Sequence, residues 1–160
     1  MGWNETDLSY AAGIVDGEGC LMAERSKRQR KSGNCHINYV PTVKVAMTDQ
    51  VVIGWLYNLF GGDTGIIQPH IKNYKIQYTW RIRCKPAIEF IKIIKPYLKA
   101  KKLQAEVFVA FEKTLTNNRP STGRWGAELL DPNVQSQKEK LYNLLKNLHK
   151  ENNNDVRLDI

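Results

Sequence analysis

Apolar and polar residues alternate with two different periods along the first part of the chain. Asn4 can cap a helix and glycines follow Asp16, which predicts a helix over residues 5–16. A period of two over residues 20–26 and 37–47 predicts two strands, because alternate side chains of a strand point to opposite faces. A long, strongly basic segment joins them.

A second unit of helix and hairpin follows. Thr48 or Asp49 can cap a helix whose apolar residues repeat at i, i+3, i+4 and i+7, and the glycine pair 61–62 ends it. Two further strands are expected over residues 66–72 and 76–84. The second of these has the clearest alternation in the chain.

The remaining third reads as helices. Pro86 and Pro96 each suit a first helical position, which predicts a short helix ending at Ile94 and then a longer one. Asp131 can cap a last helix. Its expected buried stripe consists of Leu141, Leu144, Leu145 and Leu148.

The order of elements is therefore α-β-β-α-β-β followed by helices alone, an α+β fold. Each predicted hairpin has one apolar and one polar, basic face. We expect an antiparallel, four-stranded sheet whose apolar face is covered by helices and whose other face is open. The length of 160 residues suits a single domain, with a core over residues 5–115 and a helical tail over residues 127–150.

Charge and cysteine content narrow the class. Twenty-four Lys and Arg against 16 Asp and Glu give a formal net charge of +8, which favours a polyanionic partner. The three cysteines lack CxxC spacing, which argues against a disulfide framework and a structural zinc site and favours a reducing, intracellular location. No apolar run is long enough to cross a membrane, so no membrane partner is expected.

Residues 11–19, Ala-Ala-Gly-Ile-Val-Asp-Gly-Glu-Gly, resemble the LAGLIDADG motif of homing endonucleases. Six of nine positions agree when Val is accepted for Ile and Glu for Asp. The resemblance extends to the order of elements over residues 5–115, which is the family's αββαββα core, with a saddle-shaped sheet. The motif occurs once, and in this family a single motif implies a homodimer.

The motif residues suggest how two copies would meet. Two first helices can cross closely at Ala12 and Gly13 because neither carries bulk, and this brings Glu18 of each copy near a two-fold axis. Two carboxylates in proximity repel unless a cation joins them, and hard oxygen ligands beside phosphate favour Mg²⁺. The expected dimer interface consists of Ala11, Ala12, Gly13 and Asp16.

The resemblance also implies individual roles. Glu18 corresponds to the metal-binding acid and Gly17 to the position whose backbone carbonyl joins the metal shell. Asp16 corresponds to the motif's other acid, which supports the helix end. Lys101 stands where the family often carries a basic residue near the reacting phosphate, where it would stabilise developing charge; the alternative is a solvated lysine face.

DNA contacts are expected from the polar sheet face and from the basic segment 25–31. Arg can bridge guanine O6 and N7, Gln can bridge adenine, and Glu can accept from cytosine N4. The expected sheet-face residues are Met22, Glu24, Ser26, Thr42, Lys44, Gln68, His70, Lys72, Gln77, Thr79, Arg81 and Arg83. The expected phosphate contacts of the basic segment are Lys27, Arg28 and Arg30.

The sequence thus predicts a homodimeric, Mg²⁺-dependent endonuclease that cuts double-stranded DNA at a long, nearly palindromic site. The alternative on the same scaffold is an intron RNA maturase or a DNA-binding protein that does not cleave. A third reading is an interaction protein whose basic face is incidental and whose nucleic-acid binding disappears by physiological salt. A mitochondrion, a chloroplast and a prokaryotic cytoplasm would all suit the predicted activity.

Overall fold

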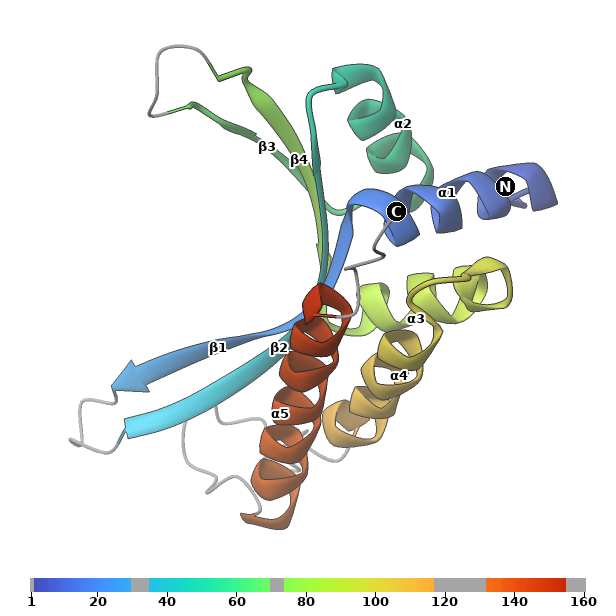
Figure 1. Cartoon of the computed structure of the whole chain (residues 1–160). Helices are drawn as coiled ribbons and strands as arrows, with labels where there is room; N and C mark the ends of the chain where they lie inside the picture. Colours follow the sequence, from blue (N-terminus) through green and yellow to red (C-terminus); the bar gives the residue numbers. More distant parts are fainter. Residues whose placement is uncertain (1, 30–34, 70–73, 117–131, 155–160) are drawn as a thin grey trace.

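The computed structural model describes residues 2–29, 35–69, 74–116 and 132–154 (Figure 1). Helices and strands follow one another in the predicted order. The elements are α1 (Glu5–Glu18), β1 (Gly19–Gln29), β2 (Cys35–Met47), α2 (Gln50–Phe60), β3 (Asp63–Ile67), β4 (Gln77–Arg83), α3 (Cys84–Ile94), the 3₁₀ turn η1 (Lys95–Tyr97), α4 (Lys102–Thr116) and α5 (Pro132–Asn154).

The four strands form one antiparallel sheet in the order β1-β2-β4-β3. The two hairpins meet along β2 and β4, where Val43 lies opposite Ile82. The α-helices of the described residues lie on one side of the sheet, and the two hairpins diverge so that the other side is open and concave (Figure 1). The predicted α+β fold, with helices on one face, is confirmed.

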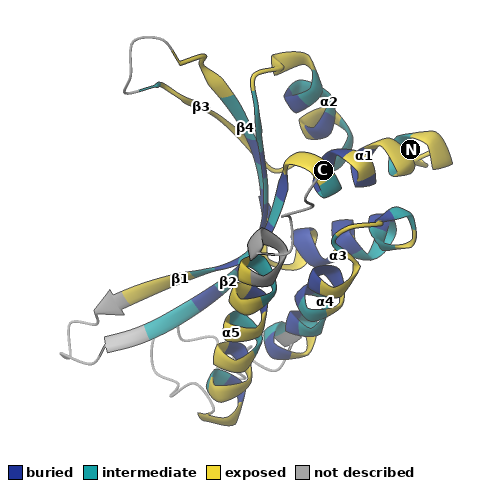
Figure 2. Ribbon diagram, viewed as in Figure 1, coloured by how far each residue is buried: buried dark blue, intermediate teal, exposed yellow. Residues whose placement is uncertain are grey.

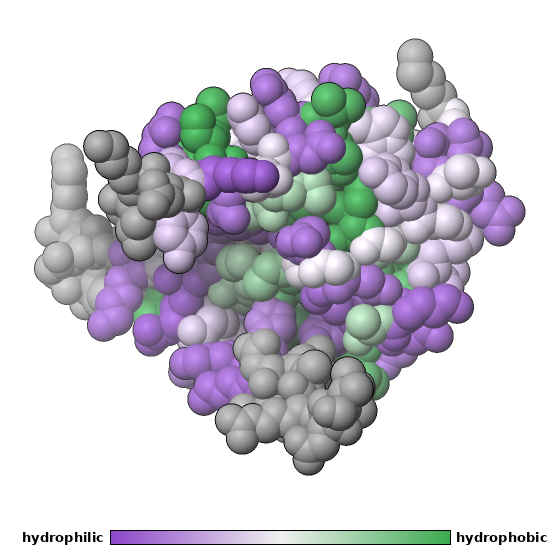
Figure 3. Space-filling model, turned by 45° about the horizontal axis from the view of Figure 1, so that its top comes forward, coloured by the Kyte–Doolittle hydropathy of each residue, from purple (hydrophilic) through white to green (hydrophobic). Residues whose placement is uncertain are grey.

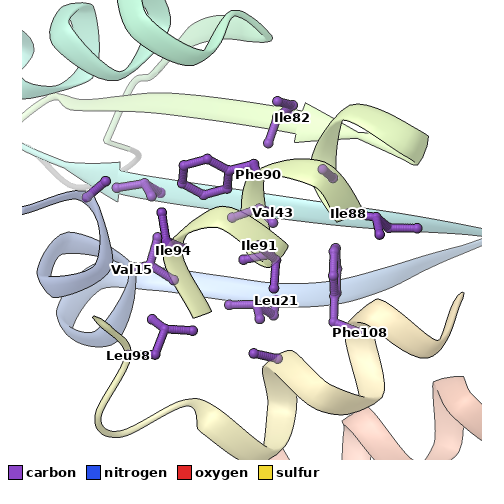
Figure 4. Packing of buried hydrophobic residues seen from close by; sticks show 14 of the residues in the cluster. Val15, Leu21, Val43, Ile82, Ile88, Phe90, Ile91, Ile94, Leu98 and Phe108 are labelled. Carbon is purple, nitrogen blue, oxygen red and sulfur yellow. The ribbon is translucent and has the colours of Figure 1, made fainter. Parts of the chain in front are cut away.

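The core lies between the sheet and the helices (Figure 2). Leu21 and Val43 of the sheet face Ile91 of α3 and Phe108 of α4 (Figure 4). Trp80 of β4 is fully buried with its ring in the core. Its indole N–H donates to Gly61 O at 2.7 Å, so the polar group is satisfied where water does not reach it. These buried positions confirm the predicted inner faces of β1, β2 and β4.

Some large apolar side chains stay outside this core. Tyr10 of α1 is 51% exposed, and Ile66 of β3 and Tyr74 are also exposed. Figure 3 shows apolar residues between hydrophilic ones on one face of the molecule. No helix within the described ranges combines the length and apolar character that a membrane crossing requires.

Helix α1 begins as predicted and ends later. The Asn4 side chain accepts a hydrogen bond from the Asp7 N–H at 2.7 Å. The helix continues to Glu18, two residues beyond the expected end, because Gly17 remains helical and Gly19 is extended with a φ of −83°. The motif glycines therefore do not end the helix in the left-handed conformation typical of C-terminal caps.

Other element boundaries also differ from the prediction. Strand β3 begins at Asp63, three residues before the predicted start, because this residue pairs directly with Arg81. Pro96 lies in the 3₁₀ turn, so the long helix starts at Lys102 and not at the proline. Cys84 adopts a φ of 59° and begins α3, so it does not continue the apolar face of β4.

Helix α5 packs against α4 and against the first hairpin. The Gln135 side-chain amide donates to Ile37 O at 2.9 Å, and the rings of Tyr39 and Tyr142 lie 5.3 Å apart. The predicted leucine stripe is only partly correct, since Leu145 is buried while Leu144 is 47% exposed. The stripe instead includes aromatic and polar residues. One of these is Lys138, whose ammonium pKa is lowered by burial.

Gly61 and Gly62 provide a matched pair for testing how tightly α2 is joined to the sheet. Both have positive φ, but only at Gly62 would a Cβ collide with backbone, 2.5 Å from Arg81 O. We expect Gly61→Ala to lower the free energy of unfolding by about 1–3 kcal/mol, because its φ of 70° and ψ of −151° are readily adopted only by glycine, and Gly62→Ala by about 2 kcal/mol or more beyond that, as measured by urea denaturation. Equal losses would contradict the close approach.

Candidate active site and nucleic-acid interface

The candidate active site lies where α1 ends and β1 begins. Glu18 is the last residue of α1, and both it and Gly17 are exposed. Gly19 is buried at the turn into the sheet, where a Cβ would lie 2.7 Å from the Cα and the carbonyl oxygen of Val15. The fold of the chain therefore requires glycine at position 19, and the sharp turn presents Glu18 at the surface.

A reciprocal set of contacts, which we call the Asp16–Lys101 clamp, fixes this helix end. The Asp16 carboxylate accepts from the backbone N–H groups of Lys99 at 2.6 Å, Ala100 at 3.2 Å and Lys101 at 3.0 Å. In return, Lys101 Nζ donates to Val15 O at 2.9 Å and to Asp16 O. A cation at the carbonyl end of α1 is favourable because these carbonyls carry partial negative charge.

The clamp changes the interpretation of two predicted residues. Asp16 was expected at the dimer interface, but its carboxylate is occupied by its own chain. Lys101 does lie beside the end of α1, although it is distant from that helix in the sequence: its ammonium group bonds the carbonyls of Val15 and Asp16, just before Glu18. Two of the three donors of its ammonium group bond backbone carbonyls, so its evident role in the chain is to hold the helix end.

The predicted dimer residues of α1 also divide into two groups. Ala11 and Ala12 are fully buried in the chain's own core, which leaves them no exposed surface in the single chain, and their assignment to a dimer interface stays a prediction. Gly13 is exposed, and so is Gly17 one turn later. The helical rotation of 100° per residue places the two alanines on the inner side with Val15 and the two glycines on the outer side.

Two titratable side chains near the clamp were not singled out from the sequence. Burial raises the pKa of the Cys20 thiol, and the charges of Lys101 and Lys44 act in the opposite direction. Burial lowers the pKa of His149, which comes from the distant helix α5. Only the tertiary packing of α5 against β1 brings this histidine to the site, so residue spacing gave no signal for it.

The described residues of one chain do not bring several metal-binding side chains together. Among the described residues, no group of three or more His, Cys, Asp or Glu side chains converges. The donors at the end of α1 are the Glu18 carboxylate and neighbouring backbone carbonyls. These hard oxygen donors suit Mg²⁺, which usually binds one or two carboxylates and keeps several waters, so the residues fit the ion once a second carboxylate is supplied.

Polar side chains lie in rows across the open face of the sheet, as the alternation predicted. The central row runs over all four strands and consists of Cys20, Lys44, Arg81 and Asp63. The adjacent row consists of Met22, Thr42 and Arg83. A shallow hollow of about 120 Å³ lies on this face, bordered by Lys44, Asp63, Gly65, Thr79 and Arg81 among others.

Two acids pair with the two arginines of this face. Arg83 Nη2 donates to Asp63 Oδ2 at 2.9 Å. Arg81 Nη1 lies 4.0 Å from Glu24 Oε1. Each arginine thus pairs with an acid outside its own row, and the Asp63 contact is much the shorter. Asp63 was not identified from the sequence, because its pairing with Arg83 depends on the register of β3 against β4.

The other predicted DNA contacts differ in how they are placed. Thr42 is fully buried and its hydroxyl donates to Val40 O at 3.1 Å, so it offers no exposed group, and we do not include it among the proposed contacts. Lys27 lies in β1, which extends through Gln29, and pairs with Ile37 of β2, so it is not in a loop. It alternates in step with the buried Leu21 and Ala23, which places it on the helix side of the sheet. The remaining described candidates on the open face, exposed or partly exposed, are Met22, Glu24, Ser26, Lys44, Gln77, Thr79, Arg81 and Arg83, with Gln68 exposed just beyond β3.

Three of the predicted contacts, Arg30, His70 and Lys72, lie outside the described residues. Arg28 lies in β1, but its side chain is likewise outside the described part of the chain. These four assignments therefore stay predictions.

Comparison with known proteins identifies the fold. Neither a protein-family model nor a curated protein matches the sequence. The homing endonuclease I-CvuI, in complex with the I-CreI target, has a TM-score of 0.68 at 18% identity, covering 90% of this chain and 82% of its own. The archaeal intron-encoded homing endonuclease I-Vdi141I, complexed with DNA, has a TM-score of 0.65 at 17% identity, covering 90% and 84%.

A longer chain also matches this one in fold, over less than half of its own length. The LAGLIDADG homing endonuclease I-SmaMI, bound to cleaved DNA, has a TM-score of 0.60 at 18% identity, covering 88% of this chain and 43% of its own. The chain therefore has the LAGLIDADG homing-endonuclease fold. Its size is consistent with the type that carries a single motif per chain.

Asp16 and Asp49 allow a matched test of the clamp. Asp49 caps α2 through one oxygen, which accepts from both Val51 N and Val52 N, and asparagine caps equally well. Asp16 uses both oxygens, and asparagine would put an NH₂ group in place of one of them. We expect Asp16→Asn to lower the free energy of unfolding by about 2 kcal/mol and Asp49→Asn to change it by less than about 0.5 kcal/mol, as measured by denaturant titration. Similar values for both variants would argue against the clamp.

Proposed function

We propose that this chain is one subunit of a homodimeric, divalent-metal-dependent endonuclease that cuts double-stranded DNA at a specific, nearly palindromic site. The observation that carries the proposal is an exposed carboxylate, Glu18, at the end of a helix that exposes Gly13 and Gly17 in its last two turns, within the LAGLIDADG fold. The proteins of similar fold named above are homing endonucleases, and several are bound to DNA.

The glycines of α1 support the dimer. A Cβ at Gly13 or Gly17 would meet no atom within 4 Å, so the chain's own fold does not need glycine at either position. Glycine in a helix interior costs about 1 kcal/mol relative to alanine. A second copy of α1 packed against this face explains the glycines, because only a residue without a side chain lets two helix backbones approach so closely.

A dimer formed in this way supplies the second carboxylate. The two-fold axis beside α1 would bring Glu18 of both copies together, and the Gly17 carbonyl is the adjacent backbone oxygen. Mg²⁺ bound there would supply charge neutralisation at the scissile phosphates and a lower pKa for an attacking water. The chain contributes the anchoring: the Asp16–Lys101 clamp holds the helix end, so that the carboxylate is presented in a fixed place.

The open sheet face supports DNA recognition. Its concave shape (Figure 1) and the cations Lys44, Arg81 and Arg83 suit the groove of a duplex. The residues proposed to contact DNA are Met22, Glu24, Ser26, Lys44, Gln68, Gln77, Thr79, Arg81 and Arg83, together with Arg28, Arg30, His70 and Lys72. A two-fold dimer reads two half-sites in opposite orientation, which requires a nearly palindromic target.

Glu18→Gln tests the catalytic role on a target duplex selected by cleavage from a random library with Mg²⁺. We expect cleavage to fall by at least about 10²-fold because the amide lacks the charge that binds the metal, while the duplex dissociation constant stays within about threefold. Glu5→Gln, the same change at the exposed other end of α1, is the control and should preserve both. Normal turnover of Glu18→Gln would remove the metal assignment.

If the wild-type chain binds a duplex tightly and cleaves none in the library, the non-cleaving alternative is supported. Binding of intron RNA in preference to every duplex would support the maturase alternative. Either result would contradict the endonuclease proposal.

Gly13→Ala and Gly54→Ala test the dimer with the same substitution on two helices. Neither new Cβ meets an atom of its own chain within 4 Å, so each should stabilise its helix by up to about 1 kcal/mol. Only Gly13→Ala should weaken the dimer, by about tenfold or more, because its methyl group lies in the helix crossing. Sedimentation over a concentration series measures this. An unchanged dimer constant in Gly13→Ala would exclude the crossing.

A further inference from the structure

Asp63 occupies a fixed position at the edge of the open sheet face. It is the first residue of β3 and lies opposite Arg81 in the register. The residue before it, Gly62, packs against the backbone of Arg81 so closely that a Cβ would lie 2.5 Å from the Arg81 oxygen. The main chain at Asp63 therefore has little freedom to shift relative to β4.

From this position Asp63 reaches along β4 to Arg83. The distance of 2.9 Å between Asp63 Oδ2 and Arg83 Nη2 makes this a charge-assisted hydrogen bond. The side chains are 58% and 42% exposed, respectively. Exposed ion pairs contribute little to folding stability because solvent screens them and two side chains lose rotamer freedom. Stability alone therefore gives no reason for this pair.

The chemistry of the arginine suggests another reason. A free guanidinium on a DNA-binding surface contacts phosphates of any sequence, whereas a guanidinium held in one orientation can read a guanine edge through its planar donors. A carboxylate beside it also repels phosphate, because both are anions. One hydrogen bond to Asp63 leaves the other N–H groups of Arg83 available.

We infer that Asp63 is a specificity-determining positioning residue: by holding Arg83 on the sheet and repelling phosphate, it assigns Arg83 to a base edge of the target. This inference rests on the proposed function. It assigns Asp63 no contact with the reacting phosphates. Glu24 holds Arg81 less tightly, since their atoms are 4.0 Å apart, so Arg83 is the better fixed of the two arginines.

The test measures duplex binding as a function of base sequence and salt for wild type, Asp63→Ala and Arg83→Ala. Both variants should lose about tenfold or more of the discrimination at the same base pair of each half-site. Asp63→Ala should bind unrelated duplex more tightly and show a salt dependence steeper by about one phosphate contact per subunit, because Arg83 is then free to bind the backbone. The double variant should lose no more discrimination than Arg83→Ala alone.

Three further variants separate positioning from other effects. Asp63→Glu, which keeps the charge, should restore most of the discrimination, and Asp63→Asn should fall between wild type and Asp63→Ala. Glu89→Ala removes an exposed, ion-paired acid on α3 and controls for the change in net charge. Thermal unfolding should be nearly unchanged in Asp63→Ala, because the pair is exposed. If that variant unfolds, Asp63→Asn carries the test.

Unchanged discrimination and salt dependence in Asp63→Ala, equal to those of Glu89→Ala, would overturn the role of Asp63 while leaving the proposed function intact. A wild-type chain without any sequence preference would overturn both, so the two failures are distinguishable.

Discussion

The Asp16–Lys101 clamp is the contact on which the candidate site depends. It joins the end of α1 to the start of α4, segments separated by about 85 residues along the chain, through three N–H groups in one direction and an ammonium group in the other. The carboxylate satisfies amides that precede α4, and the cation bonds two carbonyls in the last turn of α1, of which Val15 O also accepts from the Gly19 N–H. Because both ends are satisfied together, the position of Glu18 depends on this long-range contact as well as on the tight turn at Gly19.

The glycines discussed above fall into two groups, those that the fold of the chain requires and those that it does not. Gly19 and Gly62 are required by the fold, since a side chain at either would strike backbone. Gly13 and Gly17 are not required by it, although each lowers the stability of its helix. Gly54 of α2 is likewise not required, but Gly13 and Gly17 lie one turn apart on the exposed face of α1, and this repetition points to contact with something outside the chain. The exposed acid Glu18 lies on the same helix as these glycines, so the proposed dimer contact and the proposed metal ligand belong to one element.

The periodicity of the sequence was sufficient to predict the two faces of the sheet but not the contacts of the candidate site. The alternation around Val43 and Trp80 predicted the inner faces correctly, because a period of two is insensitive to tertiary detail. The inward position of Ala11 and the burial of Thr42 were missed, because small or polar residues give a weak signal of which side they face. The Lys101 ammonium bonds the end of α1, and Asp63 pairs with Arg83. Both contacts depend on segments that are distant in the sequence, and the spacing of residues in one sequence does not predict such contacts.

Acids on a basic surface affect how its cations bind, and the net charge alone does not show this effect. Arg83 without Asp63 would have many accessible rotamers, and ordering a free arginine on binding costs about 0.5–1.5 kcal/mol. In this structure the ordering is largely complete before any ligand arrives, since the pair is formed in the isolated chain. The same acid weakens attraction to every phosphate. Weaker binding to phosphates in general and a better-defined orientation of the arginine both favour discrimination between base sequences. An acid among cations is therefore expected on a surface that selects a particular sequence. On a surface that binds any sequence, the same acid only lowers the affinity.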